Sequence, residues 1–414
     1  MAYDVADRSS VGETLLIYAP VPLYAKDGIL YQEDQACNGL RLWAENFANV
    51  LAIHPLAPGD PPPAWVPLED GVGTNMARIE IHPVPMAYRP DQFIRHLRPV
   101  RRQIRALIER ADYMSFAIGG LFGDWGAVSC LEAHRMGRPF AVWTDRVESQ
   151  VTRRAAESGS LRSRIRSGLY HRPMAWLERH VIGKATLGLF HGRDTFETYA
   201  PHCREPQLVH DIHLKARDHI PSDRREAKIA EAGSGPLRLA YVGRADPPKG
   251  PLDWVAVTER LAAAGVDFRA TWLGDGQDHA EMTARIAAAG LADRVAMPGH
   301  VTDRTTVLDT LRDAHLFLFC HKTQESPRCL IEALASATPI AGYGSAYSQD
   351  LISANGGGRL CPLDDVSALS NAIAGLAADR AELADLIARA GRDGAPFTDD
   401  AVFHHRSELI REYL

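Results

Sequence analysis

The chain has 414 residues, a length that predicts two domains of ordinary size. Hydrophobic residues make up 46% of it and charged residues 24%, a composition typical of soluble globular proteins that excludes disordered, collagen-like and coiled-coil proteins. Lys and Arg number 46 against 52 Asp and Glu, so the net charge is −6. This balance gives no reason to expect a nucleic acid as partner.

The six cysteines are scattered and form no C-x-x-C pair, so the sequence predicts neither a zinc site nor a disulfide framework. The first residues lack the basic start and apolar run of a signal peptide, and the apolar stretches are too short to span a bilayer. The expected location is the cytoplasm, either free or peripheral on the inner face of the cytoplasmic membrane.

Apolar runs alternate with helical patterns through the first half of the chain. The predicted strands are Thr14–Ala19, Val50–Ile53, Ala77–Ile81, Tyr113–Ile118, Phe140–Trp143 and Leu187–Phe190. Helical patterns fill the intervals, including an Arg-rich one at Pro90–Arg110. Strands that alternate with helices predict parallel pairing through crossovers, and hence a doubly wound α/β sheet.

A second α/β alternation follows a charged, Gly-containing stretch at Ser222–Pro236, which we interpret as a linker. The predicted strands beyond it are Leu237–Val242, Phe268–Leu273, Val295–Met297, Leu316–Cys320 and Pro339–Tyr343. The sequence thus predicts a first domain over 1–225, a second over 236–397, and a helix over 398–414 that crosses back to the first domain.

The residues that follow the strands of the second domain carry the candidate chemistry, because ligands of open α/β sheets bind beyond the carboxyl ends of the strands. Arg244 and Lys249 lie between a strand and a helix, where two cations and a helix N-terminus suit a phosphate or diphosphate. A solvated loop with incidental charges is the alternative. Gly274-Asp275-Gly276 follows the next strand as a tight turn, but it lacks the third glycine of a dinucleotide fingerprint.

Two carboxylates follow the strand Leu316–Cys320. Glu325 lies in the loop and Glu332 in the first turns of the next helix, so both can face the same side as the two cations. A carboxylate can accept hydrogen bonds from the two hydroxyls of a vicinal diol, such as a ribose or a hexose. The alternative is a glutamate placed near a helix N-terminus for the macrodipole alone.

The ordered set Val242-Gly243-Arg244, Lys249-Gly250, Leu273–Gly276, Pro298–Val301 and Glu325–Ala335 resembles the donor-binding half of family 4 glycosyltransferases. The resemblance implies the GT-B fold, with two Rossmann-like domains facing a central cleft, and a mostly retaining, metal-independent transfer from a nucleotide-diphosphate sugar. It implies that Arg244 and Lys249 bind the diphosphate, Glu332 the ribose and Glu325 the sugar. Arg244, Lys249 and Glu325 would be the catalytic residues. The implied donor-binding residues are Gly243, Arg244, Lys249, Gly274, His300, Val301, Glu325, Arg328, Cys329, Leu330 and Glu332.

One spacing departs from the family pattern. The family usually separates its two glutamates by seven residues, whereas six separate Glu325 from Glu332 here. The loop therefore holds one residue fewer, which bears on the placement of Glu325. Arg328 between them can instead reach a phosphate or an acidic sugar.

The first domain resembles the family in architecture. A His-Asp pair often follows its strand equivalent to Phe140–Trp143, and Thr144-Asp145 stands here. Asp145 is a candidate sugar or acceptor contact, with a helix cap or turn residue as the alternative. Gly28 is expected near the sugar and phosphate, in the loop after the first strand, with Lys26 and Asp27 as acceptor contacts.

The stretch Val151–Lys184 carries eight basic residues against two acidic ones, a local net charge of +6, with apolar residues interleaved. It can be a basic amphipathic surface that rests on anionic lipid and reaches a lipid-linked acceptor. The alternative is a solvated Arg-rich helix face. The expected partners are a nucleotide-sugar donor and a saccharide or polyprenyl-diphosphate-linked acceptor, with no cofactor and no metal.

The sequence therefore predicts a retaining glycosyltransferase that uses a UDP- or GDP-sugar, acting in bacterial surface polysaccharide synthesis. The chain contains no D-x-D motif, which is consistent with metal-independent transfer. Two alternatives remain: a GT-B sugar-nucleotide epimerase and a catalytically silent nucleotide-sugar-binding subunit. A dehydrogenase is disfavoured because its glycine fingerprint is absent.

Overall fold

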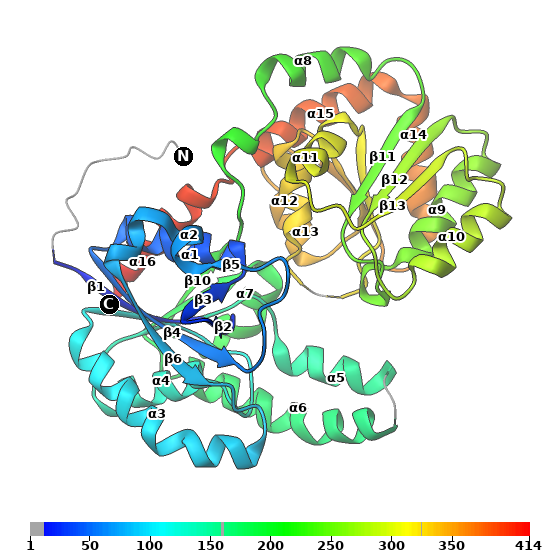
Figure 1. Ribbon diagram of the computed structural model, residues 1–414. Helices are drawn as coiled ribbons and strands as arrows, with labels where there is room; N and C mark the ends of the chain where they lie inside the picture. The colour runs from blue at the N-terminus through cyan, green and yellow to red at the C-terminus, as the bar shows by residue number, and fades with distance from the viewer. Residues whose placement is uncertain (1–11, 159–160, 324) are drawn as a thin grey trace. The chain divides into compact units, whose positions relative to one another are not determined.

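The computed structural model describes residues 12–158, 161–323 and 325–414, and within 154–167 only the backbone of the described residues. The chain divides into two compact units, the first made by the residues up to His213 together with Asp399–Leu414 and the second by Leu214–Thr398 (Figure 1). Among the described residues, no helix has the length and apolar character needed to cross a bilayer.

The first unit is built on a ten-stranded sheet in the order β10-β9-β8-β7-β1-β4-β2-β3-β5, with β6 also paired to β4. Its strands are β1 (Thr14–Tyr18), β2 (Leu23–Lys26), β3 (Ile29–Gln32), β4 (Asn49–Ala57), β5 (Val66–Pro67), β6 (Ile79–Pro85), β7 (Tyr113–Ala117), β8 (Ala141–Thr144), β9 (Leu187–His191) and β10 (Glu205–Val209). All pairs are parallel except β2–β3 and β3–β5, which are antiparallel.

Helices cover both faces of this sheet, as a doubly wound architecture requires. They are α1 (Asp34–Asn46), α2 (Leu68–Val72), α3 (Pro90–Arg110), α4 (Trp125–Arg135), α5 (Glu148–Ser158), α6 (Leu161–Ile182), α7 (Arg193–Tyr199) and α16 (Asp399–Tyr413). Successive side chains of β1 point to opposite faces: Leu16 and Tyr18 enter the core that α3 and α4 cover, and Leu15 and Ile17 enter the core of α1 and α16.

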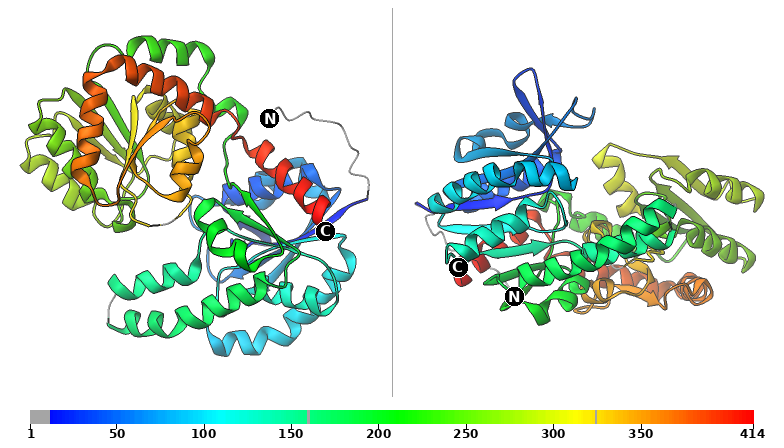
Figure 2. Two further views of the ribbon diagram at one scale, coloured as in Figure 1. Left: turned by 180° about the vertical axis from the view of Figure 1, so that it is seen from behind. Right: turned by 90° about the horizontal axis from the view of Figure 1, so that it is seen from below.

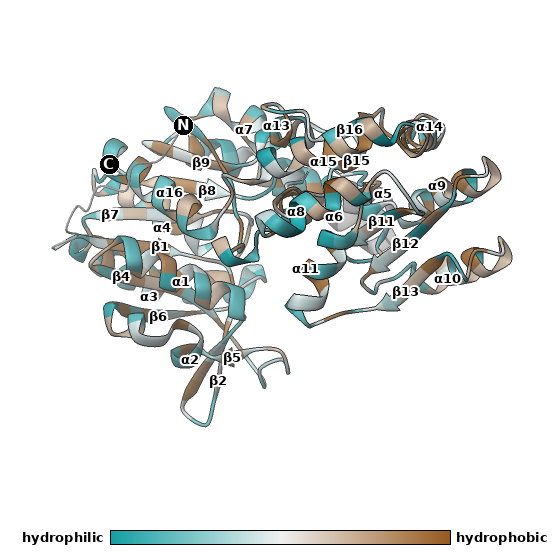
Figure 3. Ribbon diagram, turned by 90° about the horizontal axis from the view of Figure 1, so that it is seen from above, coloured by the Kyte–Doolittle hydropathy of each residue, from teal (hydrophilic) through white to brown (hydrophobic). Residues whose placement is uncertain are grey.

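The second unit holds a six-stranded sheet in the order β13-β12-β11-β14-β15-β16, parallel throughout. Its strands are β11 (Leu237–Val242), β12 (Phe268–Leu273), β13 (Val295–Gly299), β14 (Leu316–Phe319), β15 (Ile340–Tyr343) and β16 (Gly358–Cys361). Its helices are α8 (Ser222–Glu231), α9 (Pro251–Ala263), α10 (His279–Ala288), α11 (Arg304–Asp313), α12 (Arg328–Ala335), α13 (Ala346–Leu351), α14 (Val366–Ala378) and α15 (Arg380–Gly394). Figure 3 shows hydrophilic and hydrophobic residues mixed along these helices, as in amphipathic helices that cover a sheet.

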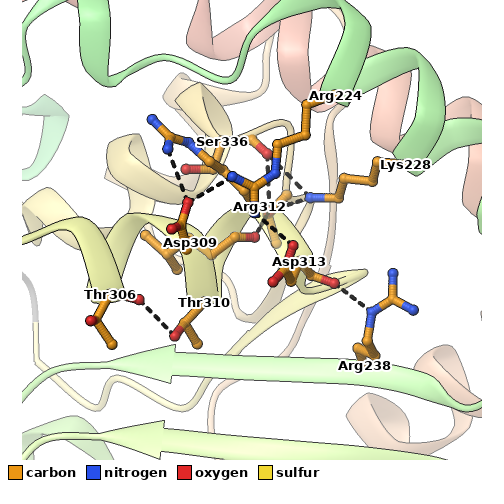
Figure 4. A network of polar contacts seen from close by, with 11 residues as sticks. Arg224, Lys228, Arg238, Thr306, Asp309, Thr310, Arg312, Asp313 and Ser336 are labelled. Atoms are coloured by element: carbon orange, nitrogen blue, oxygen red, sulfur yellow. Dashed lines mark hydrogen bonds and ion pairs between the residues drawn. The ribbon is translucent and has the colours of Figure 1, made fainter.

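The interpretation of Ser222–Pro236 as a linker is wrong for its first ten residues, which form α8 of the second unit. Arg224 pairs with Asp309 and Asp313 of α11 at 2.6 and 2.8 Å (Figure 4). The ammonium of Lys228, which is 4% exposed, donates to Ser336 O at 3.1 Å and Thr338 Oγ1 at 2.6 Å. Polar contacts fix this helix, so its apolar periodicity is weak and the sequence pattern concealed it.

The units also divide at a different position from the predicted one. The boundary lies between His213 and Leu214, ahead of α8, rather than within 225–236. The chain returns to the first unit at Asp399, so α16 belongs with the first sheet. There Phe403, 3% exposed, packs edge-on against Trp43 of α1 with 4.9 Å between ring centroids. The buried guanidinium of Arg406 lies 4.8 Å from the centre of the Trp43 ring.

Candidate functional site

The turns after β11, β12 and β14 lie side by side, because these strands are neighbours in the second sheet. Backbone hydrogen bonds join them. Gly243 N donates to Leu273 O at 2.9 Å, Ala245 N donates to Asp275 O at 3.0 Å, and Lys322 N donates to Pro248 O at 2.9 Å. The polar groups carried by these turns are therefore held at one edge of the sheet, the edge where ligands of such sheets bind.

Two glycines make this close approach possible. A Cβ on Gly274, whose φ is +147°, would lie 2.0 Å from Gly243 O, and one on Gly250, whose φ is +62°, would lie 2.1 Å from Cys320 O. Any side chain at either position would push two of the turns apart. Gly274, which the family resemblance implies is a donor-binding residue, therefore also holds two of the turns close together.

The structure brings Lys249 and Glu325 together. The Lys249 ammonium lies 2.5 Å from Glu325 Oε1, which also accepts from Thr323 Oγ1 at 3.1 Å. Their side chains are 15% and 31% exposed, so the pair is partly screened from water. Glu325 therefore neutralises Lys249, the cation for which the family resemblance implies a diphosphate partner.

Arg244 occupies a more open position in the same loop, which joins β11 to α9. Its guanidinium is 79% exposed and lies 3.0 Å from Asp246 Oδ2, while Asp246 Oδ1 accepts from Gln277 N at 3.1 Å. An exposed ion pair of this kind is weak, so the guanidinium is available to an incoming anion. Arg244 and Lys249 together can supply two cations to one diphosphate.

Glu332 lies within α12 and contacts the start of α11. Its Oε1 is 2.7 Å from Arg304 Nη1, with the two side chains 17% and 43% exposed. His300 and Val301 follow β13, where His300 is exposed and Val301 half-buried. These residues border the same edge of the sheet from its β13 side.

The remaining predicted donor residues lie on the first turn of α12. Arg328 and Cys329 are half-buried, and Leu330 is 1% exposed and packs in the core. Burial raises the pKa of the Cys329 thiol to about 12, which leaves it protonated and unreactive near neutral pH. The side chain of Leu330 supports the helix, and only its backbone can face a ligand.

The sequence analysis did not select three polar residues at this edge: Tyr241, His321 and Lys322. His321, directly after β14, shares a 2.8 Å hydrogen bond with the Tyr241 hydroxyl, and both side chains are buried. Burial, with a smaller contribution from the Lys249 ammonium, holds the pKa of His321 well below its usual range. Lys322 pairs with Asp253 at 2.8 Å. Their position at the end of a predicted strand, the criterion by which Arg244 was selected, could have identified them in the sequence.

In the first unit, Asp27 and Gly28 do not lie in a strand-to-helix loop, and that prediction is wrong. They form the tip of the β2–β3 hairpin, with φ of +53° and +80° between the paired residues Lys26 and Ile29. An Asp-Gly dipeptide with two positive φ angles is the turn that a two-residue hairpin requires. Both tip residues are exposed, and Lys26 pairs with Asp60 at 3.2 Å.

Asp145 follows β8, as predicted, and is exposed. Two other carboxylates, which the sequence analysis did not select, lie at the same edge. Asp124 caps α4 and accepts from Gly119 N and Gly120 N at 3.0 Å each, and burial raises its pKa. Glu148 pairs with Arg146 at 2.6 Å, and burial raises its pKa as well. The loops after β7 and β8 thus gather acidic groups.

The basic stretch Val151–Lys184 lies on α5 and α6, which pack against each other as a helical pair in the first unit (Figure 2). The side chains of residues 154–167, including Arg154, Arg162, Arg164 and Arg166, lie outside the described residues. Among the described side chains, Leu169 and Trp176 are 68% and 64% exposed and stand beside exposed Arg172 and Arg179.

Comparison with known proteins finds a family match for most of the second unit. Residues 222–393 match the family described as "Glycosyl transferases group 1". The chain is 30% identical over 247 residues to a 2-deoxystreptamine glucosyltransferase of Streptomyces kanamyceticus, and 29% identical over 261 residues to a 2-deoxystreptamine N-acetyl-D-glucosaminyltransferase of Streptomyces fradiae. These alignments cover 56% and 59% of this chain, and in both cases 60% of the relative.

A third relative is a putative colanic acid biosynthesis glycosyltransferase, WcaL, of Escherichia coli K12, 29% identical over 42% of this chain and 45% of its own length. Among solved structures, HepE of Anabaena in complex with UDP superposes with a TM-score of 0.68 at 13% identity, over 97% of this chain and all of that one. WaaG, a glycosyltransferase involved in lipopolysaccharide biosynthesis, gives 0.60 at 13% identity, over 96% and 99%. The chain thus has the GT-B fold, and its residues 222–393 resemble the glycosyl transferases group 1 family.

Proposed function

We propose that the chain is a retaining, metal-independent glycosyltransferase that takes a hexose from a UDP- or GDP-sugar. The observation that carries this proposal is the joint placement of Arg244, Lys249, Glu325 and Glu332 at one strand-end edge of the unit whose residues 222–393 resemble the glycosyl transferases group 1 family. The relatives named as glycosyltransferases, and the neighbouring fold solved with UDP, support the same donor class.

In the proposed reaction, the bond between the anomeric carbon and the diphosphate oxygen breaks and a bond to the acceptor oxygen forms. The acceptor proton passes to the leaving phosphate oxygen, so a protein nucleophile is not required. Arg244 and Lys249 stabilise the negative charge that develops on the diphosphate, and loss of one preorganised group of this kind typically costs roughly 100- to 1000-fold in rate.

We propose that Glu332 binds the ribose and Glu325 the sugar hydroxyls. Each carboxylate accepts a hydrogen bond from a cation of the same chain, Arg304 for Glu332 and Lys249 for Glu325. Binding of the donor would therefore exchange these partners for hydroxyl groups and phosphate. A hydrogen bond to a charged group contributes about 1.5–3 kcal/mol, enough to discriminate between sugars.

For the acceptor, we propose a glycan or lipid-linked saccharide of a bacterial surface polysaccharide, reached from the membrane surface. The putative colanic acid relative supports this class, and so do Leu169 and Trp176, exposed beside Arg172 and Arg179 on α6. An aminocyclitol acceptor is the second candidate, because two relatives are named for 2-deoxystreptamine.

A thermal-shift series with UDP, GDP and ADP, followed by transfer assays with the matching nucleotide sugars, tests the proposal. A ligand present at 100 times its Kd stabilises a protein by about 2.7 kcal/mol. Product formation with lipid-linked saccharide or with 2-deoxystreptamine separates the two acceptors. Conversion of the sugar nucleotide without an acceptor would instead identify an epimerase. A nucleotide shift without transfer or conversion would favour the silent nucleotide-sugar-binding subunit, and the absence of any shift would refute the donor site.

A further inference from the structure

The imidazole of His321 is a buried polar group two residues beyond the end of β14. It has no part in the proposed reaction. The residue is 8% exposed, and it follows the strand at the ligand-binding edge of the sheet. Its Nε2 lies 2.8 Å from the Tyr241 hydroxyl, whereas its Nδ1 is buried without a hydrogen-bond partner among the described residues. Among the described residues, the hydrogen bond of this ring is therefore the one to Tyr241.

Tyr241 lies directly beneath the turn that carries Arg244. Its ring is fully buried and lies 3.9 Å from the Trp272 ring and 5.4 Å from the Phe317 ring, measured between centroids. A Cβ on Gly243 would lie 2.8 Å from the Tyr241 hydroxyl oxygen. The hydroxyl thus supports the backbone of Gly243, one residue before Arg244, and a shift of the hydroxyl would shift that turn.

The other side of His321 is joined to the turn that carries Lys249. Lys322 N donates to Pro248 O at 2.9 Å, and the α-carbon of Gly250 packs against Cys320 O. The segment 320–322 consequently holds both ends of the loop 243–250: the Lys249 end through its backbone, and the Arg244 end through the hydrogen bond from His321 to Tyr241. His321 connects the two cations without touching either turn's charged group.

A second buried histidine shows that burial alone does not produce this arrangement. His315 is fully buried in the same unit, immediately before β14, where its Nδ1 accepts from Arg238 N at 3.1 Å and its Nε2 has no partner among the described residues. It matches His321 in burial and in having one bonded nitrogen. It lies at the amino end of the strand, however, away from the ligand-binding edge.

We propose that His321 is a positioning residue of the nucleotide-diphosphate site, which through its hydrogen bond to Tyr241 fixes the spacing between Arg244 and Lys249. This inference rests on the proposed function. Two cations that bind one diphosphate must lie at a fixed distance from each other, since a displacement of either end of the loop breaks one contact with a phosphate. A neutral ring suits this role because a charged one would repel the neighbouring Lys249 ammonium.

Two substitutions of the same histidine separate its two nitrogens. His321→Gln keeps a polar group at the place of Nε2 and retains the contact with Tyr241, while His321→Asn keeps a polar group at the place of Nδ1 and loses the contact. Tyr241→Phe removes the same bond from the other side. Calorimetric titration with the nucleoside diphosphate that the wild type binds, chosen from UDP, GDP and ADP, gives the Kd, and the free nucleoside serves as the second probe.

We expect His321→Asn and Tyr241→Phe each to weaken diphosphate binding about 5- to 10-fold, the range expected for one buried hydrogen bond. The two losses should not add in the double variant, and nucleoside binding should stay unchanged. His321→Gln should bind within about 2-fold of wild type, because rescue by the conservative variant follows from the retained bond.

The control is His315→Gln, which loses the hydrogen bond from Arg238 N and should lower the Tm without changing the Kd. Wild-type binding by His321→Asn and Tyr241→Phe would overturn the inference. So would an equal loss in His321→Gln, or a similar loss in His315→Gln. If the wild type binds none of the three nucleotides, the proposed function itself fails, and this outcome is distinct from unaltered binding by the variants.

Discussion

The Lys249–Glu325 pair predicts an unusual outcome for Glu325→Gln: tighter binding of the free nucleoside diphosphate together with slower sugar transfer. Glu325 Oε1 lies 2.5 Å from the Lys249 ammonium and competes with any phosphate for that cation. The change keeps the size of the side chain and its hydrogen-bonding capacity towards Thr323. It removes the negative charge that an incoming diphosphate must displace.

The magnitude follows from the exposure of the pair. With side chains 15% and 31% exposed, the pair lies between a surface ion pair, worth about 0.2–1 kcal/mol, and a buried one. Release of Lys249 and relief of the repulsion between Glu325 and the diphosphate together give about 1 kcal/mol, so we expect affinity for UDP or GDP to rise roughly 3- to 10-fold. The kcat/KM for transfer should fall about 10-fold or more, since a charged hydrogen bond to the sugar is lost.

Calorimetric titration at low and high salt measures the first effect, and initial rates of transfer measure the second. The matched control is Asp246→Asn, which removes the carboxylate beside Arg244. Because Arg244 is 79% exposed, we expect this control to change the affinity less than 2-fold. Weaker or unchanged nucleotide binding by Glu325→Gln would refute the argument that the two compete for Lys249.

Three further changes test other parts of the structure. Gly274→Ala should destabilise the second unit by several kcal/mol more than Gly265→Ala. Both glycines have a positive φ, but only at position 274 would the new Cβ clash with backbone, at 2.0 Å from Gly243 O. Equal denaturation midpoints for the two variants would contradict this. Phe403→Ala should cost about 3–5 kcal/mol in urea unfolding of the first unit, and a loss below about 1 kcal/mol would show that α16 packs only weakly. Burial lowers the pKa of Lys228 far below its ordinary value, so the unfolded chain binds more protons than the folded one between the two pKa values. Stability relative to Lys228→Met should therefore rise as pH rises from the folded-state pKa towards about 10.5, and a pH-independent difference would argue against a neutral buried amine.

Strand positions in the second unit could be predicted closely from the sequence. Leu237–Val242 and Phe268–Leu273 are observed with the predicted bounds, because each is a mostly apolar run of six residues that a glycine ends. The same logic selected the turns that carry Arg244 and Lys249. A short, mostly apolar run that ends at a glycine is a strong signal, and β11, β12 and β15 each end at one.

The hairpin at Asp27-Gly28 was missed although its signal was present. An Asp-Gly dipeptide between two short alternating runs favours a two-residue hairpin, and here Lys26 pairs with Ile29 across it. The apolar run before it and the helical pattern after it favoured a strand-to-helix loop, and that interpretation overrode the local signal. Helix α8 was missed for a different reason, because its contacts are ion pairs of Arg224 and hydrogen bonds of Lys228 that leave little apolar periodicity.

The partners of the site residues could not be predicted, because they depend on the order of strands in space. Lys249 and Glu325 are 76 residues apart and meet only because β11 and β14 are neighbours in the sheet. Tyr241 and His321 are 80 residues apart and meet for the same reason. Sequence spacing alone placed Glu325 beside Glu332 and suggested a paired sugar site. The sheet order instead gives each glutamate its own cation, so under the proposed function donor binding would exchange ion pairs rather than fill a preformed anionic site.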